Sequence, residues 1–228
     1  MQAAAGNTTL EVFENWTLRV RQPAQTPARL LLMLHGWTGD ENSMWVFARN
    51  FPTGYLLLAP RGLHPAAQGG YSWRLPRADS FGRPSLDDFR DAAEALIRLV
   101  DAYTAKACAE PSRSVRIDAS QFDVMGFSQG AALSNVLACL HPQRVRKAGI
   151  LAGFMPSGTE EVIAKKPLVG KAMFVSHGTQ DNMVPIDRAR ASMSLLEQAG
   201  AHITYCESEV GHKVSADCLR GLEVFFKN

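Results

Sequence analysis

Three residue types that together perform nucleophilic catalysis follow one another along the chain as Ser128, Asp181 and His212. A serine hydroxyl alone is a weak nucleophile at neutral pH, so it needs a base to take its proton and a carboxylate to orient that base. With both partners in place, the serine oxygen can attack an ester carbonyl and form an acyl-enzyme. The order therefore predicts acyl-transfer chemistry at Ser128.

Ser128 lies in the pentapeptide GFSQG at residues 126–130. An apolar, strand-like run at 121–126 precedes it, and an apolar helical run at 131–140 follows it. A strand, a tight turn and a helix form the context of a nucleophile elbow, in which the glycines permit the turn. Serine is also a common N-terminal cap of helices, but this context favours the nucleophile.

The candidate acid and base each follow a later apolar run. Asp181 lies in VSHGTQDNMVP, and His212 lies in SEVGHKVS. Parallel strands end at one edge of a sheet, so these two loops and the elbow are expected to meet there. The order serine, acid, histidine is the one found in α/β-hydrolases.

Other acidic and histidine residues fit the catalytic roles less well. Asp187 and Asp217 fall in the first turns of expected helices, where a negative charge is favoured by the helix dipole. His177 precedes a glycine at the end of a strand and is expected to make structural hydrogen bonds.

The negative charge that develops on the carbonyl oxygen requires preorganised donors. We expect one from the backbone N–H of Gln129 and another from Trp37, in the segment LHGWTGD that ends an earlier strand. Glycine and aspartate also occur in ordinary turns, so a simple turn is the alternative interpretation of LHGWTGD.

Large apolar side chains near the same edge are candidates for binding the substrate. Those we expect at the pocket are Trp45, Trp73, Phe127 and Met183. The irregular segment 61–85 is unusually long for a compact domain and is expected to form one wall.

Short apolar runs alternate with amphipathic stretches, which predicts an α/β fold with a mostly parallel central sheet and helices on both faces. The expected strands are 29–36, 54–60, 121–126, 148–154, 171–178 and 202–208, and the expected helices are 86–103, 131–140, 186–200 and 215–228. Residues 155–170 are too few for a large cap domain, and we expect residues 1–228 to form one domain.

Composition excludes several classes of function. The formal net charge is only +2, so we expect no nucleic-acid partner, and the small cluster Arg144, Arg146 and Lys147 is expected on a solvated face. No apolar run is long enough to span a bilayer, and the N-terminus does not resemble a signal peptide, so we expect a cytoplasmic protein without stable membrane anchoring.

The four cysteines show neither a C-x-x-C pair nor metal-ligand spacing. Cys139 and Cys206 lie in apolar helix-like and strand-like runs, where free cysteine behaves as a small hydrophobic residue. The spacing leaves a disulfide open without favouring one.

The segments LHGWTGD, APRG, GFSQGAALS, HGTQDNMVP and GH, in this order, resemble the phospholipase/carboxylesterase family of α/β-hydrolases, which includes the acyl-protein thioesterases. The resemblance runs from about residue 30 to the C-terminus. It implies an α/β-hydrolase fold, Ser128, Asp181 and His212 as nucleophile, acid and base, and Trp37 and Gln129 as oxyanion donors. Trp37 is bulkier than the usual family residue, and the segment 64–74 looks more like that of small bacterial esterases.

Our hypothesis is a serine carboxylesterase that hydrolyses short-to-medium acyl or aryl esters of small molecules without a metal or organic cofactor. An acyl-protein thioesterase or lysophospholipase is an alternative with the same chemistry. A non-catalytic ligand-binding protein of the same fold is an alternative of a different class.

Overall fold

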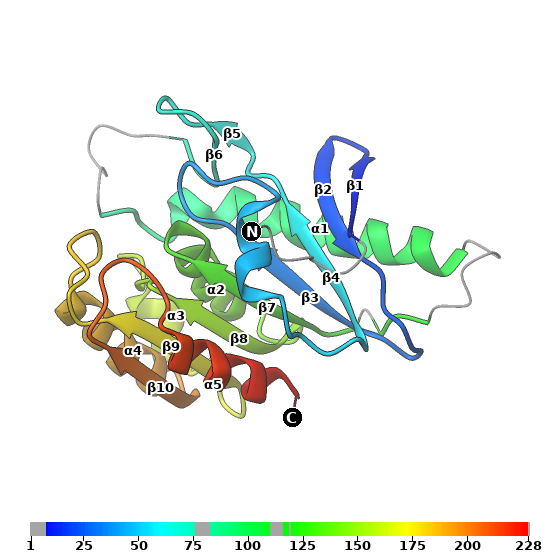
Figure 1. Cartoon of the computed structure of the whole chain (residues 1–228). Helices are drawn as coiled ribbons and strands as arrows, with labels where there is room; N and C mark the ends of the chain where they lie inside the picture. Colours follow the sequence, from blue (N-terminus) through cyan, green and yellow to red (C-terminus); the bar gives the residue numbers. More distant parts are fainter. Residues whose placement is uncertain (1–7, 76–82, 110–115, 119, 228) are drawn as a thin grey trace.

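The computed structural model describes residues 8–75, 83–109, 116–118 and 120–227. An eight-stranded sheet in the order β1-β2-β4-β3-β7-β8-β9-β10 runs through the molecule (Figure 1). Its strands are β1 (Thr8–Phe13), β2 (Trp16–Arg21), β3 (Arg29–Leu34), β4 (Tyr55–Pro60), β7 (Phe122–Phe127), β8 (Val145–Leu151), β9 (Ala172–Gly178) and β10 (His202–Ser208). The strand β2 is antiparallel to β1 and β4, and every other neighbouring pair is parallel, which confirms the mostly parallel sheet.

Helices cover both faces of this sheet. They are α1 (Asp87–Ala109), α2 (Gln129–Leu140), α3 (Glu160–Ala164), α4 (Ile186–Gln198) and α5 (Ala216–Lys227), with a 3-10 helix η1 (Ser43–Phe47). In Figure 1, α5 lies in front of the sheet and α1 behind it. Between β8 and β9 the chain forms only the short α3, in agreement with the expectation that no large cap domain is inserted there.

The alternation of side chains along β3 explains why this strand is apolar throughout. Leu30 and Leu32 point into a core shared with α1 and α2, whereas Leu31 and Met33 point into a second core shared with α5. All four are fully buried. A parallel strand covered on both faces therefore needs an unbroken apolar run, which is the pattern that the sequence shows.

The structure adds an N-terminal hairpin, β1 and β2, that the sequence did not predict. It also begins β8 at Val145, so Arg146 belongs to a strand, and its guanidinium pairs with the buried carboxylate of Asp123. Arg144 pairs with Asp101 at 2.6 Å. The expectation that this basic cluster lies on a solvated face was therefore wrong for both arginines, because each is partly buried and held by a carboxylate.

A disulfide joins Cys206, in β10, to Cys218, in the first turn of α5, at a sequence separation of 12. The expectation that Cys206 is a small free hydrophobic residue was wrong, because the end of β10 and the start of α5 bring the two sulfur atoms together. Cys139 is free and buried, as expected. Across the described ranges, no helix is both long and apolar enough to cross a membrane.

The expected irregular segment 61–85 contains a small hairpin, β5 (His64–Pro65) and β6 (Tyr71–Ser72). Tyr71 also forms an antiparallel bridge with Gly39, in the loop after β3. The hairpin therefore braces that loop. Residues 76–82 of the segment lie outside the described residues.

Candidate active site

The sharp turn between β7 and α2 carries Ser128. Its φ of 54° and ψ of −113° are rarely adopted by a residue with a side chain, and such strain is often found at functional sites. A Cβ on Gly126 would lie 2.2 Å from the carbonyl oxygen of Gly130, and one on Gly130 would lie 2.1 Å from that of Leu34. Both glycines are thus required by close backbone packing, as the elbow pattern predicted.

The carboxylate of Asp181 is buried in the turn after β9 and held at both oxygens. Its Oδ1 accepts the backbone N–H groups of Met183 and Val184, each at 2.9 Å. Its Oδ2 accepts a hydrogen bond from His212 Nδ1 at 2.6 Å. Because Nδ1 must carry the proton in this bond, Nε2 of the neutral ring can accept one.

His177 supports Asp181 from below. Its Nε2 lies 2.7 Å from the carbonyl oxygen of Val184 and 3.4 Å from Asp181 Oδ2, and the ring is buried. The structural hydrogen-bonding role expected for His177 therefore acts on the turn that carries Asp181.

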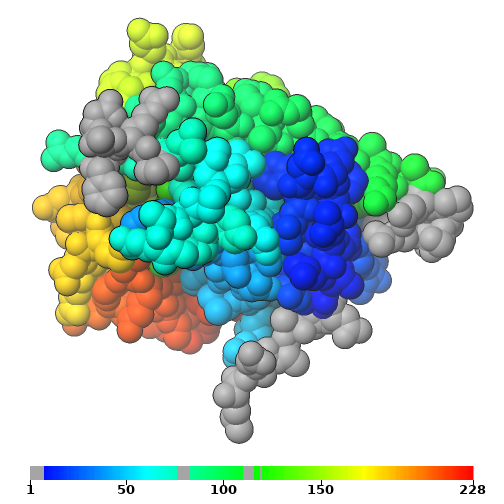
Figure 2. Space-filling model, turned by 90° about the horizontal axis from the view of Figure 1, so that it is seen from above, coloured from blue at the N-terminus to red at the C-terminus, as the bar shows by residue number. Residues whose placement is uncertain are grey.

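A cavity of about 690 Å³ opens at this edge of the sheet, and both Ser128 and His212 line it. Its walls come from the loop after β3, the β5–β6 hairpin, the elbow and the loops after β8, β9 and β10. In Figure 2, which views the molecule from above, the cyan hairpin lies beside the gold segment after β9 and the orange segment after β10. The Ser128 hydroxyl makes no hydrogen bond to the described residues, and catalytic hydrogen bonds often form only once substrate is bound.

Gln129 connects the elbow to the opposite wall. Its backbone N–H is at the first position of α2, where no intrahelical acceptor exists. Its side-chain Oε1 accepts the backbone N–H of Trp73 at 2.9 Å, and its Nε2 donates to Ser72 Oγ at 3.1 Å. Trp37 and Gln129 line the same cavity as Ser128, so the structure brings the expected oxyanion residues together with the expected nucleophile.

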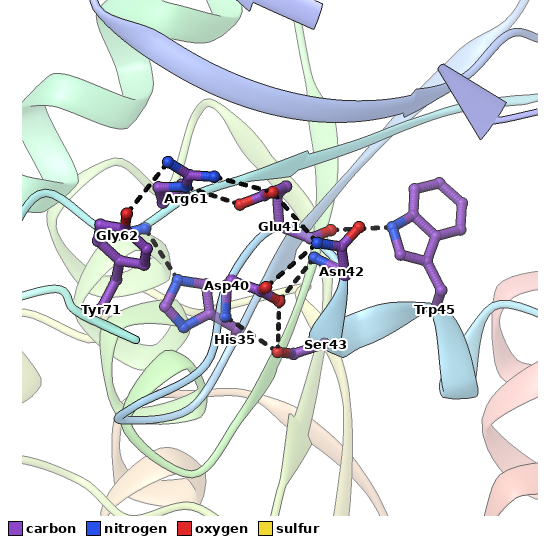
Figure 3. Close-up of polar contacts among 9 residues, drawn as sticks. All are labelled: His35, Asp40, Glu41, Asn42, Ser43, Trp45, Arg61, Gly62 and Tyr71. Carbon is purple, nitrogen blue, oxygen red and sulfur yellow. Dashed lines mark hydrogen bonds and ion pairs between the residues drawn. The ribbon is translucent and has the colours of Figure 1, made fainter. Parts of the chain in front are cut away.

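His35, the residue that ends the apolar run before Trp37, is fully buried and holds the loop after β3 in place. Its Nδ1 donates to the Gly36 carbonyl oxygen at 2.7 Å, and its Nε2 accepts the Gly62 N–H at 2.8 Å (Figure 3). The indole of Trp73 donates to the His35 carbonyl oxygen at 2.8 Å. Burial lowers the pKa of His35, which keeps the ring neutral and able to accept at Nε2.

An ion pair braces the outer side of this loop. Arg61 donates from Nε and Nη2 to the two carboxylate oxygens of Glu41, at 2.8 and 3.0 Å (Figure 3). These hydrogen bonds are the main reason that the pKa of Glu41 is lowered. Arg61 also donates to Tyr71 Oη at 3.1 Å and lies over its ring, which ties the loop to the hairpin.

Of the four side chains expected to bind substrate, Phe127 and Met183 line the cavity. Trp73 does not, because its ring is buried against His35 and serves the hydrogen bond described above. Trp45 lies in η1 and donates its indole N–H to the Glu41 carbonyl oxygen at 2.9 Å, which directs it away from the cavity. Arg188 does line the cavity, and sequence reasoning missed it because one arginine in a helix carries no motif.

Within the described residues, no group of histidine, cysteine, aspartate or glutamate side chains is arranged to hold a metal ion. The chemistry considered below therefore uses only the side chains and backbone groups described above.

The mostly parallel sheet, the strained serine turn after a central strand, and the acid and histidine after later strands define an α/β-hydrolase. The sequence profile of the Phospholipase/Carboxylesterase family matches residues 15–228. The chain belongs to this family.

Individual relatives are more distant. A probable carboxylesterase of Oryza sativa subsp. japonica is 32% identical over 110 residues, which cover 46% of this chain and 40% of the rice protein. The match thus spans less than half of that relative. The crystal structure of a carboxylesterase from Mesorhizobium loti has a TM-score of 0.79 at 21% identity, covering 98% of this chain and 100% of that one. The Bacillus cereus carboxylesterase has a TM-score of 0.77 at 19% identity, covering 94% of each chain.

Proposed function

We propose that the protein is a serine carboxylesterase in which Ser128 is the nucleophile, His212 the general base and Asp181 the residue that orients the base. The observation that carries the proposal is the 2.6 Å contact between His212 Nδ1 and Asp181 Oδ2 beside a cavity that also holds Ser128 on a strained turn. A binding protein would have no need of a buried carboxylate that selects one tautomer of a histidine at the cavity wall.

In the proposed reaction, His212 Nε2 takes the proton of Ser128 as its oxygen attacks the ester carbonyl. The backbone N–H groups of Gln129 and Trp37 stabilise the oxyanion, and each such donor is typically worth a few kcal/mol in the transition state. His212 then protonates the leaving alcohol. Water activated by the same ring releases the acid from the acyl-enzyme.

The size of the cavity supports esters of small molecules. A volume of about 690 Å³ is within the usual range for small-ligand sites. Met183 and Trp37 are partly exposed and line the cavity, so its opening is partly apolar. We propose short-to-medium acyl or aryl esters as substrates, with no cofactor.

Covalent labelling together with hydrolysis tests this proposal. Wild-type protein should react with a fluorophosphonate probe and hydrolyse p-nitrophenyl butyrate, whereas Ser128→Ala should do neither. Ser194→Ala, which removes an exposed hydroxyl of α4, is the matched control and should behave as the wild type. Absence of both labelling and turnover in the wild type would contradict the proposal and favour a binding protein.

The acyl-chain profile separates the esterase from a thioesterase or lysophospholipase. We expect kcat/KM for p-nitrophenyl esters to fall once the acyl chain exceeds medium length. A steady rise from short to long chains would favour a lipid or acyl-protein substrate.

A further inference from the structure

Arg188 places a cation at the wall of the cavity that also contains Ser128 and His212. It lies in the first turn of α4 and is half-buried. Its guanidinium carbon is 3.7 Å from the centroid of the Phe154 ring, which lines the same cavity. Stacking on an aromatic ring uses the face of a guanidinium, whereas hydrogen bonds are donated from its edge, so the stack orients the edge without occupying it.

The stack is fixed by buried polar groups on both sides. Asn135 Nδ2 donates to the Phe154 carbonyl oxygen at 3.1 Å. Ser192 Oγ accepts the Met155 N–H at 2.7 Å and donates to the Arg188 carbonyl oxygen at 2.7 Å. Asn135 and Ser192 are buried, so the segment after β8 and the start of α4 are locked together. The position of Arg188 relative to Phe154 is therefore built into the fold.

The surroundings of Arg188 disfavour a positive charge. The first turn of a helix favours anions over cations. Burial, and secondarily the charge of Arg83, lower the pKa of Arg188. Arg74 lines the same cavity, and no aspartate or glutamate is among the described residues that do so. A local conflict of this kind is expected where function requires the residue.

We propose that Arg188 binds a carboxylate carried by the ester substrate, so that the enzyme selects anionic esters over neutral ones. This inference rests on the proposed esterase function and names its substrate class. A carboxylate matches the planar fork of an arginine and would receive two N–H donors from it. It would also supply the negative charge that the start of α4 and the arginine-lined wall favour.

Matched pairs of esters test the proposal. Monomethyl adipate and methyl hexanoate differ by a carboxylate in the acyl part, whereas 4-acetoxybenzoate and 4-acetoxybenzamide differ by one in the leaving group. We expect the wild type to prefer the anionic member of at least one pair by about tenfold or more in kcat/KM. In Arg188→Met, the ratio of kcat/KM for the anionic ester to that for the neutral ester should fall by about tenfold. The ratio cancels any loss of folded protein.

Arg190→Met is the matched control. Arg190 lies on the same helix, pairs with Glu207 at 2.9 Å and is exposed, so its loss changes the net charge equally. It should leave the ratio within about twofold. A wild type that prefers the neutral member of both pairs, or an equal fall in both variants, would overturn the proposal.

A binding measurement separates failure of this inference from failure of the proposed function. Titration of monomethyl adipate into Ser128→Ala, followed by calorimetry, needs no turnover. Its Kd should rise about tenfold when Arg188→Met is added. Normal Ser128-dependent hydrolysis of methyl hexanoate with no change in Kd would refute the role of Arg188 alone. A change in Kd without any wild-type hydrolysis would refute the esterase and keep the anion site.

Discussion

The two walls of the cavity are built on different principles. On the side of β7, β9 and β10, the proposed chemistry belongs to the side chains of Ser128, His212 and Asp181. On the side of β3 and β4, it belongs to backbone N–H groups, and side chains such as His35 and Glu41 only hold the backbone in place. The first wall is braced by a disulfide and the second by a polar network.

This difference predicts how each wall fails. Removing a side chain from the first wall removes a reacting group, so the loss should be large and confined to activity. Removing one from the second wall leaves the reacting groups present but displaces them, so activity and stability should fall together and by less.

The largest expected effect is that of Asp181→Asn. An amide cannot hold His212 in the required tautomer, so kcat should fall by about 10⁴-fold with little loss of folded protein. Steady-state kinetics and circular dichroism measure the two quantities.

Asp187→Asn is the matched control for that experiment, because Asp187 is the nearest competing carboxylate and is exposed. It should keep nearly full activity. If Asp181→Asn remained fully active, another carboxylate would have to orient His212, and the first wall would lose its defining residue.

The next effect concerns the covalent brace of the first wall. Replacing Cys206 and Cys218 together by alanine frees a loop of about a dozen residues, which should reduce the free energy of unfolding by about 3 kcal/mol. Urea unfolding without reductant measures it, and Cys108→Ala, which removes an exposed free thiol, is the control. Adding dithiothreitol to the wild type should reproduce the loss; an unchanged midpoint in both experiments would mean that the bond does not brace the loop.

A smaller effect is expected from Glu41→Gln in the second wall. The substitution keeps the shape but removes the charge that receives two hydrogen bonds from Arg61, so unfolding free energy should fall by about 1–3 kcal/mol. A fall in kcat of less than about 100-fold should accompany it. The exposed pair of Asp87 and Arg90 gives the control, because Asp87→Asn should cost less than about 1 kcal/mol. Equal losses in the two variants would show that the polar network is no brace.

The smallest effect is a pH dependence of the second wall. Burial lowers the folded-state pKa of His35 below its ordinary value of 6.5, so the unfolded chain takes up the proton first as the pH falls. His35 should therefore contribute its full stability above pH 6.5 and lose it progressively below, with a slope of at most about 1.4 kcal/mol per pH unit. Unfolding curves between pH 7.5 and 5.5 measure this slope, and His35→Gln should show a shallower one. Parallel curves for the two proteins would refute it.

The first wall could be predicted from sequence because its residues follow fixed elements. A buried parallel strand is apolar on both faces, and its carboxyl end carries the functional loop, so Ser128, Asp181 and His212 could each be placed by the strand before it. The side-chain roles also restrict the residue types, which leaves few candidates.

The second wall could not be predicted in the same way. Glu41 and Arg61 are ordinary surface residue types that meet only because β3 and β4 are neighbours, and Trp73 looked like a ligand-binding residue because its buried partner His35 lies far away in sequence. The hairpin β1–β2 was missed because Leu10 and Val12 are exposed at the sheet edge, where alternation does not report a core. The pairing of Cys206 with Cys218 depends on geometry that their spacing does not reveal.

The bond between Cys206 and Cys218 has a consequence for proteolysis. It makes the segment that carries His212 a closed ring, with β10 entering it and α5 leaving it. A protease that cuts once inside this ring would not divide the protein into two molecules, since both pieces would stay joined through sulfur. Such a nicked chain would migrate as one band without reductant and as two with it, with the whole of α5 on the smaller fragment.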